Sequence, residues 1–389
     1  MYPYTDDEVP GVISNLLAND EFVDLLGRFD SPRLASVAPW LVRKVARRRL
    51  AGLLGDVGSI SQFQAIVEHY VARLIASSMA SFEQTGIEFL DASKAYIFIS
   101  NHRDIAGDSM LVDYALHRRG FPTVRIAVGD NLLQKQYATD LMRLNKGFFI
   151  KRSGGAPRAV YAALLESSRF IQESIRDGHS IWIAQAQGRA KDGIDRTDPA
   201  VIKMLTLADR KRPFTEVICS LSLVPVSLSY EYDPCDTLKA RELAAVNAQG
   251  RYEKPAGEDL LSLVRGLTGE KGRVSLSFNR PLTGHYETPE AVAAALDQAV
   301  LGQLRIFPIN YLALAALADR EPGSEYESVY RQVKDQFSTG VSLPADATFS
   351  SRLAGVPAGD QAAWLRLYAN PVLNKVSHNL PVCFEPSAQ

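Results

Sequence analysis

Cysteine is scarce in this chain of 389 residues, and the three cysteines, Cys219, Cys235 and Cys383, form no CxxC pair. An odd, scattered set argues against a disulfide framework and against a zinc site. Such a chain suits a reducing compartment. We therefore expect a cytosolic protein with no bound metal.

Long apolar runs are also missing. The N-terminal residues MYPYTDDEVP are acidic and lack the basic segment followed by an apolar stretch that marks a signal peptide. Near the C-terminus, the nearly uncharged apolar run 308–318 is far shorter than the roughly 20 residues that span a bilayer. We expect a protein that does not cross a membrane.

No charge sign dominates, since 43 lysines and arginines stand against 44 aspartates and glutamates. This balance gives no reason to expect nucleic acid as a partner, and any basic surface must be local. The hydrophobic share of 46% is ordinary for a globular protein and is enough to build a sizeable core.

The first 90 residues are typical of helices. Residues 59–82 repeat apolar side chains at a helical period. Residues 34–54 alternate apolar side chains with arginines and a lysine, and they include Trp40. Such a stretch suits an interfacial helix over anionic lipid, and equally a helix packed on the rest of the protein with its arginines in water.

From about residue 95 the pattern changes to short β-rich runs separated by helical segments. The β-rich runs are 96–100, 124–128, 147–151, 180–184, 223–230 and 273–278. The helical segments are 108–118, 159–176, 199–208 and a pair within 236–267, followed by 310–318, 324–337 and 360–370. This alternation predicts an α/β fold with a mostly parallel central sheet flanked by helices. We expect an N-terminal helical region (1–90), an α/β domain (91–305) and a C-terminal helical extension (306–389).

One histidine has the setting of a general base. His102 directly follows the run 96–100, and Asp104 and Asp108 lie two and six residues further on. An imidazole at the carboxyl end of a strand can accept a hydroxyl proton, and a carboxylate can orient it and stabilise the imidazolium. Residues six apart differ by about 240° in direction on a regular helix. His102 therefore meets Asp108 only if it lies in the turn before the helix.

Two further β-rich runs end in cations. The run 147–151 begins at Gly147 and ends in Lys151 and Arg152, which suit a phosphate near a helix N-terminus and equally a solvated basic turn. The run 180–184 leads into a turn with small, amide and basic side chains: Gln187, Gly188, Arg189 and Lys191. Pro225, in the run 223–230, marks an edge, a bulge or a strand start.

In this order, the four blocks resemble the four motifs of the glycerol-3-phosphate and lysophosphatidate acyltransferase superfamily. The resemblance covers residues 95–282, about half of the chain. It implies that His102 and a downstream aspartate are the catalytic pair. The residues that it implies for binding the acceptor or lining the site are Asn101, Arg103, Gly147, Phe149, Lys151, Arg152, Gln187, Gly188, Arg189, Lys191 and Pro225.

The sequence departs from the family pattern in three places. The usual His–Asp spacing would place the acid at Gly107, so we take Asp108 as the partner of His102 and keep Asp104 as the alternative. Gln187 stands where the family has glutamate, which keeps the shape of the side chain but removes its charge. Gly188 and Arg189 are contiguous, so Arg189 need not correspond to the family arginine.

The resemblance implies acyl transfer from acyl-CoA or acyl-carrier protein to a hydroxyl of glycerol-3-phosphate or 1-acylglycerol-3-phosphate in phospholipid synthesis. It implies no metal and no tightly bound cofactor, and it places the enzyme in the cytoplasm, peripheral to the inner face of the cytoplasmic membrane. Two alternatives stay open: a lyso-aminolipid acceptor, and a catalytically silent protein that binds lipid or acyl carrier.

A protein kinase is excluded although His102-Arg103-Asp104 imitates a kinase catalytic loop. A kinase needs an asparagine five residues after the aspartate, where this sequence has Ser109. No DFG motif follows.

Overall fold

The computed structural model describes residues 1–130, 135–151, 156–255, 257–337 and 343–384. Two compact units make up the chain. Unit 1 consists of residues 1–72 and 124–167, and unit 2 of residues 73–123 and 168–389. Helices α5 (Ile60–Ser78) and α8 (Pro157–Arg176) begin in unit 1 and end in unit 2.

Unit 1 is mainly helical. Its further elements are α1 (Val9–Ala18), α2 (Asp20–Asp30), α3 (Pro32–Val37), α4 (Pro39–Leu54), α7 (Gln136–Leu144) and the parallel strands β3 (Arg125–Gly129) and β4 (Gly147–Ile150). The side chain of Asn19 starts α2 by accepting a hydrogen bond from the Phe22 N–H at 2.9 Å, as helix caps do. The core of unit 1 joins α1 to the start of α5 and to α7, with Leu16 and Leu144 fully buried.

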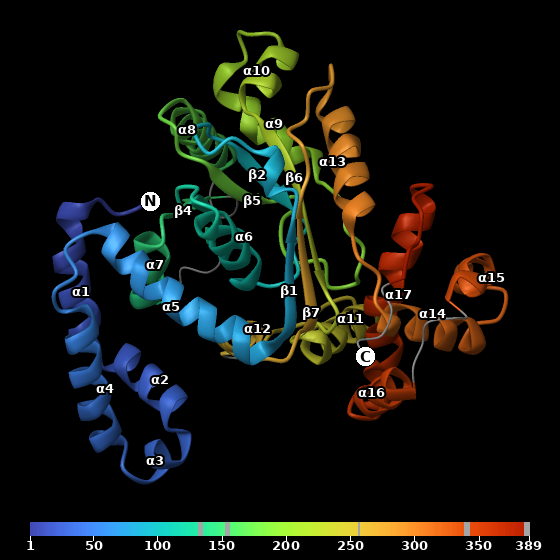
Figure 1. Cartoon of the computed structure of the whole chain (residues 1–389), viewed down its shortest axis with the longest axis horizontal. Helices are drawn as coiled ribbons and strands as arrows, with labels where there is room; N and C mark the ends of the chain where they lie inside the picture. The colour runs from blue at the N-terminus through green and yellow to red at the C-terminus, as the bar shows by residue number, and fades with distance from the viewer. Residues whose placement is uncertain (131–134, 152–155, 256, 338–342, 385–389) are drawn as a thin grey trace. The chain divides into compact units, whose positions relative to one another are not determined.

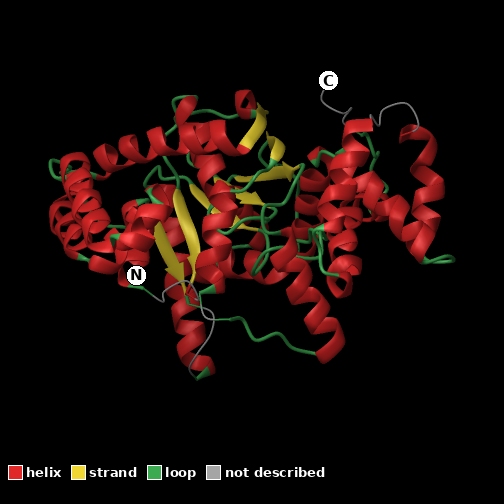
Figure 2. Cartoon of the chain, turned by 90° about the horizontal axis from the view of Figure 1, so that it is seen from below, coloured by secondary structure: helices red, strands yellow, loops and turns green. Residues whose placement is uncertain are grey.

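Unit 2 contains a mixed sheet. Its strands are β1 (Met79–Thr85), β2 (Ile97–Ser100), β5 (Ile181–Ala184), β6 (Leu223–Tyr230) and β7 (Gly272–Phe278), in the order β1-β7-β6-β2-β5. β2 pairs in parallel with β5 and β6, and β1 pairs in parallel with β7, whereas β6 and β7 are antiparallel. The strands are yellow in Figure 2. The predicted α/β class with a mostly parallel sheet is confirmed.

Helices surround this sheet, and more follow it towards the C-terminus (Figure 1). They are α6 (Gly107–Arg118), α9 (Pro199–Thr206), α10 (Phe214–Ser220), α11 (Asp236–Gln249), α12 (Glu258–Thr268), α13 (Pro289–Gln303), α14 (Pro308–Arg320), α15 (Glu325–Phe337), α16 (Leu343–Ala354) and α17 (Gln361–Ser377). α14 and α17 pack against each other, and together with α11, α13 and α15 they form a core around Trp364, which is fully buried. The predicted C-terminal helices are therefore present.

The secondary structure departs from the sequence expectation at the end of α5. The helix expected over 59–82 stops at Ser78, and residues 79–85 form β1, so that part of the prediction was wrong. β1 lies at the end of the strand order and pairs only with β7 among the strands of unit 2. That pairing with residues nearly 200 positions away overrides the local helical pattern. Helices α7, α10, α13 and α16 were not predicted.

The expected domain limits 1–90, 91–305 and 306–389 stay a prediction. Among the helices in the described ranges, none combines the length and the apolar character needed to cross a membrane.

Candidate active site

Three neighbouring parallel strands of unit 2 end at the same edge of the sheet. β2 lies between β5 and β6 and runs parallel to both. The residues after these strands therefore meet, as they do at the carboxyl ends of parallel strands in α/β proteins. Residues 101–106, between β2 and α6, form what we call the β2 loop, and residues 185–198, between β5 and α9, form the β5 loop.

The β2 loop brings His102 and Asp108 together. His102 lies in the turn before α6, and its Nδ1 is 2.7 Å from Oδ2 of Asp108, in the first turn of that helix. Asp108 is fully buried, and the His102 side chain is 16% exposed. The imidazole lies edge-on to the Trp182 ring, with ring centres 5.9 Å apart. Because Nδ1 bonds to Asp108, Nε2 is the ring atom that can accept a proton.

The Asp108 carboxylate accepts three further hydrogen bonds. The backbone N–H groups of Arg103 and Asp104 donate to Oδ2 at 2.6 and 2.9 Å. The Tyr230 hydroxyl, at the end of β6, donates to Oδ1 at 2.8 Å. Burial by itself raises the pKa of Asp108, but the hydrogen bonds and the His102 charge outweigh it and hold that pKa below its usual value. The carboxylate is therefore ionised and fixed in orientation.

Asp104 has a different part in the loop. Its Oδ1 accepts hydrogen bonds from the N–H groups of Ala106 and Gly107 at 3.1 and 2.6 Å, at the start of α6. Burial, followed by the charge of Asp108, raises the pKa of Asp104. Of the two carboxylates weighed as partners of His102, Asp108 is the one within hydrogen-bond distance.

Asn101 and Arg103, expected to contact substrate, bond within the protein. The buried Asn101 amide donates to the Leu228 carbonyl and accepts from the Leu228 N–H, both at 2.8 Å. The Arg103 guanidinium donates to the buried Asp195 carboxylate at 2.5 Å. Lys239 donates to the Arg103 carbonyl at 2.7 Å. These bonds tie the β2 loop to β6, to the β5 loop and to α11.

The tip of the β5 loop is open. Gln187 and Gly188 are exposed, and Gly188 has a φ of +80°. Arg189 donates to the Ser262 hydroxyl at 2.8 Å, and Lys191 forms an ion pair with Glu242. The expected acceptor-binding cations of this loop therefore already have partners on α12 and α11.

The base of the β5 loop is held by α17. Asn370 and Asn374 donate to the carbonyls of Asp192 and Asp195, each at 2.7 Å. Gly193, with a φ of +82°, lies so close that a Cβ there would be 2.2 Å from the Leu367 carbonyl oxygen. The C-terminal helix thus fixes the segment that carries Asp195.

Pro225 is the third residue of β6 and pairs with Ile99 of β2. The antiparallel ladder with β7 begins only at the next residue, Val226. The proline therefore lies near a strand start, as predicted, where its missing N–H removes no bond to β7. Its carbonyl accepts from the Asn279 N–H at 2.9 Å.

The second predicted block lies in unit 1. Gly147 and Phe149 belong to β4 and are buried, and Lys151 follows the strand with an exposed side chain. Gly147 has little room, since a Cβ would lie 2.6 Å from the Met142 carbonyl oxygen. Arg152 lies outside the described residues. The acceptor-binding role of this block stays a prediction.

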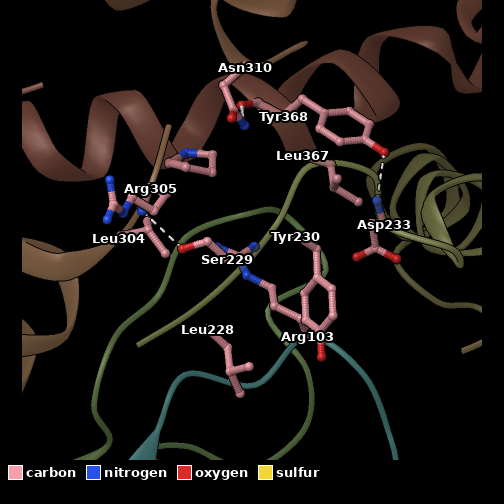
Figure 3. A pocket seen from close by; sticks show the side chains of 11 residues that line it. Arg103, Leu228, Ser229, Tyr230, Asp233, Leu304, Arg305, Asn310, Leu367 and Tyr368 are labelled. Carbon is pink, nitrogen blue, oxygen red and sulfur yellow. Dashed lines mark hydrogen bonds between the residues drawn. The ribbon is translucent and has the colours of Figure 1, made fainter. Parts of the chain in front are cut away.

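A small pocket lies beside Tyr230 and Arg103, on the side of β6 that faces α14 and α17 (Figure 3). Its lining residues are Arg103, Leu228, Ser229, Tyr230, Asp233, Leu304, Arg305, Asn310, Leu367, Tyr368 and Pro371. The Ser229 hydroxyl accepts from the Arg305 N–H at 2.9 Å, and the Tyr368 hydroxyl accepts from the Asp233 N–H at 3.0 Å. His102 is not in this lining.

The sequence interpretation missed Tyr230 and Asp195. A signal for Tyr230 was present, because it ends the apolar run 223–230 and so lies at the edge of the sheet where parallel strands deliver site residues. Asp195 has no comparable signal, because it reaches Arg103 across 92 positions.

Part of the chain is similar in sequence to known proteins. Residues 81–195 match the family model described as Acyltransferase. Dihydroxyacetone phosphate acyltransferases from Bos taurus and Homo sapiens are 24% and 23% identical to this chain over 188 residues, which is 48% of this chain and 26% of each relative. The chain thus spans about a quarter of the length of these relatives.

A solved structure is also similar. It is the 1-acyl-sn-glycerophosphate (LPA) acyltransferase PlsC from Thermotoga maritima, with a TM-score of 0.39 and 14% sequence identity, covering 72% of this chain and 92% of its own.

Proposed function

We propose that this chain, which matches the Acyltransferase family model over residues 81–195, transfers an acyl group from a thioester to a hydroxyl of a glycerophosphate-type acceptor. The observation that carries the proposal is the 2.7 Å contact between His102 Nδ1 and the enclosed Asp108 carboxylate. This pair leaves Nε2 as a general base at the edge of the sheet.

In the proposed mechanism His102 Nε2 removes the proton of the acceptor hydroxyl as the oxygen attacks the thioester carbonyl. Asp108 stabilises the imidazolium that forms. When the tetrahedral intermediate collapses, the C–S bond breaks and the thiolate takes the proton from the imidazolium. The products are an ester and a free thiol. The donors that we propose are acyl-CoA and acyl-carrier protein.

The acceptor is proposed to be glycerol-3-phosphate or 1-acylglycerol-3-phosphate. Arg189 and Lys191 are the cations of the β5 loop proposed to hold its phosphate, and the expected role of Lys151 and Arg152 stays a prediction. Cations that fix the acceptor raise the rate by positioning its hydroxyl beside the carbonyl. The ion pair of Lys191 with Glu242 would then be exchanged for one with the phosphate.

The test is thiol release from palmitoyl-CoA and palmitoyl-carrier protein, each offered with glycerol-3-phosphate, lysophosphatidate or a lyso-aminolipid. Acceptor-dependent release with one of the two glycerophosphates, together with the matching ester product, is the expected result. Release only with the lyso-aminolipid would move the acceptor to that class. No release with any pair from folded protein would contradict the proposal and leave a protein that binds lipid or acyl carrier.

We also propose that the enzyme meets its lipid at a membrane surface through α3 and α4. Apolar side chains there are exposed, led by Val37 at 84% and Trp40 at 70%. The other exposed apolar residues of the two helices are Leu34, Leu41, Val45 and Leu53. Lys44, Arg48 and Arg49 are exposed beside them. Apolar side chains with flanking cations suit the interface of an anionic bilayer.

Not all cations of α4 are available to lipid. Arg43 bonds to Asp20 at 2.9 Å and to Asp24, and Arg47 bonds to Asp20, so both hold α4 against α2. The variant to make is therefore Lys44, Arg48 and Arg49 to glutamate. Arg119, Arg169 and Lys211, three exposed cations in unit 2, give a matched control with the same change of charge.

Sedimentation with phosphatidylglycerol vesicles measures the effect. We expect the α4 variant to lose vesicle binding and the control variant to keep it. Equal binding by the native protein and the α4 variant would contradict this location.

A further inference from the structure

Tyr230 contacts the oxygen of Asp108 that His102 does not use. Its hydroxyl donates to Oδ1 at 2.8 Å, while Oδ2 receives His102 and two backbone N–H groups. Figure 3 shows Tyr230 among the residues that line the cavity behind the β2 loop. The phenol comes from β6, 122 positions along the chain from Asp108.

We propose that Tyr230 is a positioning residue for the His102–Asp108 pair. A carboxylate held only through Oδ2 is free to turn about its last side-chain bond. With Oδ1 fixed by Tyr230 the carboxylate plane is set, and Oδ2 stays directed at Nδ1. The consequence for catalysis rests on the proposed acyl transfer, whereas the geometry does not.

The Tyr230 phenol keeps its proton. Burial, and then the charges of Asp108 and Asp104, raise the pKa of Tyr230 well above its usual value. The hydroxyl therefore stays protonated over the whole range in which a histidine titrates, and it cannot itself serve as a base near neutral pH.

The strand that delivers Tyr230 is tied to the β2 loop. The amide of Asn101, the residue before His102, bonds to both the N–H and the C=O of Leu228, two residues before Tyr230. β6 is thereby fixed in register with the end of β2. Two sets of hydrogen bonds thus hold β6 beside the pair: Asn101 of the β2 loop bonds to the backbone of Leu228, and Tyr230 bonds to the Asp108 carboxylate in the first turn of α6.

Other charged groups face the pair. Asp104 lies on the same loop, Asp233 is paired with Lys239 of α11, and Arg103 is paired with Asp195 of the β5 loop. None of these groups is changed by Tyr230→Phe, which removes one oxygen and keeps the ring. A change in the pH behaviour of that variant would therefore report the lost hydrogen bond.

The first test compares Tyr230→Phe with the native protein in the acyl-transfer assay over a range of pH. A hydrogen bond to a charged group is worth about a ten- to hundredfold change in an equilibrium, so we expect kcat to fall by about that factor while KM changes by less than about twofold. Loss of the donor leaves the carboxylate charge less compensated, so protonation of the pair becomes easier. The midpoint of the acidic limb of the rate profile should move to higher pH.

Tyr368→Phe is the matched control. Tyr368 is buried and, like Tyr230, donates to a carboxylate, that of Asp236, at 2.9 Å. Its removal is expected to lower the melting temperature and to leave the pH profile in place. An equal shift of the profile in both variants would show a general structural effect and overturn the proposal.

A double-mutant cycle shows whether Tyr230 acts through Asp108. In the Asp108→Ala background, which has no side-chain oxygen to accept the Tyr230 hydrogen bond, Tyr230→Phe should change the remaining kcat by no more than about twofold. The full ten- to hundredfold loss in that background would overturn the proposal, since Tyr230 would then act independently of the carboxylate.

An NMR titration of the His102 ring separates this proposal from the proposed reaction, because it needs no substrate. His102→Gln identifies the signal. A titration midpoint that moves to higher pH in Tyr230→Phe supports the positioning role even if no acyl acceptor is found. An unmoved midpoint contradicts it even if acyl transfer is established.

Discussion

The β2 loop and the β5 loop leave neighbouring parallel strands at one edge of the sheet, yet they are built differently. In the β2 loop the side chains of Asn101, Arg103 and Asp104 bond within the protein, and the partner of His102 is fully enclosed. In the β5 loop the tip at Gln187 is exposed, although α17 holds the base. The residues around His102 are thus held by hydrogen bonds within the protein, whereas the tip of the β5 loop is exposed to solvent.

The largest effect on activity is expected from removing the charge that orients His102, the carboxylate of Asp108. Asp108→Asn keeps the shape of the side chain but replaces an ionised acceptor, so we expect kcat to fall by roughly 10²- to 10⁴-fold. Asp104→Asn is the control within the same loop, and its kcat should stay within about tenfold of native because Asp104 bonds to backbone N–H groups. Steady-state kinetics on both variants decide between the two carboxylates; a larger loss in Asp104→Asn would reverse their roles.

The close contact between α17 and the β5 loop predicts that a side chain at Gly193 lowers the free energy of unfolding. Gly193→Ala places a methyl group 2.2 Å from the Leu367 carbonyl oxygen at a φ of +82°, and should cost about 2–5 kcal/mol of unfolding free energy. Gly188→Ala, at a φ of +80° but with no atom within 4 Å, should cost about 1–2 kcal/mol. Denaturant unfolding measures both. Equal losses of unfolding free energy in the two variants would mean that the contact between Gly193 and α17 does not contribute to the cost of the substitution.

The enclosed Asp104 predicts a pH-dependent effect on stability. Its pKa is raised in the folded protein, so its contribution favours folding below the unfolded pKa and is lost as the pH rises through the folded value. Asparagine does not ionise, so the Asp104→Asn variant does not lose stability in this way as the pH rises. Its melting temperature relative to native should therefore increase as the pH rises above about 4, the ordinary pKa of an aspartate. A difference that shrinks over this range would contradict the raised pKa.

The smallest effect is expected at the open tip. Gln187→Glu restores the charge of the resembled family at an exposed position, where solvent screens it. We expect kcat to stay within about twofold and the KM for a phosphate acceptor to change by no more than about threefold. Acceptor-dependence curves measure both. A hundredfold rise in kcat would instead make the β5 loop part of the chemistry.

Much of this arrangement could be predicted because its signals are local. The apolar runs gave six of the seven strands in the described residues, and His102 stood out because it directly follows one of them. The spacing of His102 and Asp108 required a turn before the helix, and the structure has that turn. β1 was missed because its stability comes from pairing with the distant β7.

The partners of the site residues could not be predicted in the same way. Asn101, Arg103, Arg189 and Lys191 were selected by residue type, which does not say which group each side chain meets. Their partners come from β6, the β5 loop, α12 and α11. Such contacts between segments far apart in the chain depend on tertiary packing, and a single sequence carries no direct signal for them.

The central claim is that His102 is the general base of an acyl transfer. The most direct measurement is single-turnover thiol release, with ester formation, by native protein, His102→Ala and the control His285→Ala, whose imidazole is 76% exposed. The account predicts that His102→Ala slows the step by roughly 10²- to 10⁴-fold while folding normally, and that His285→Ala matches the native protein. Near-native ester formation by folded His102→Ala would contradict it.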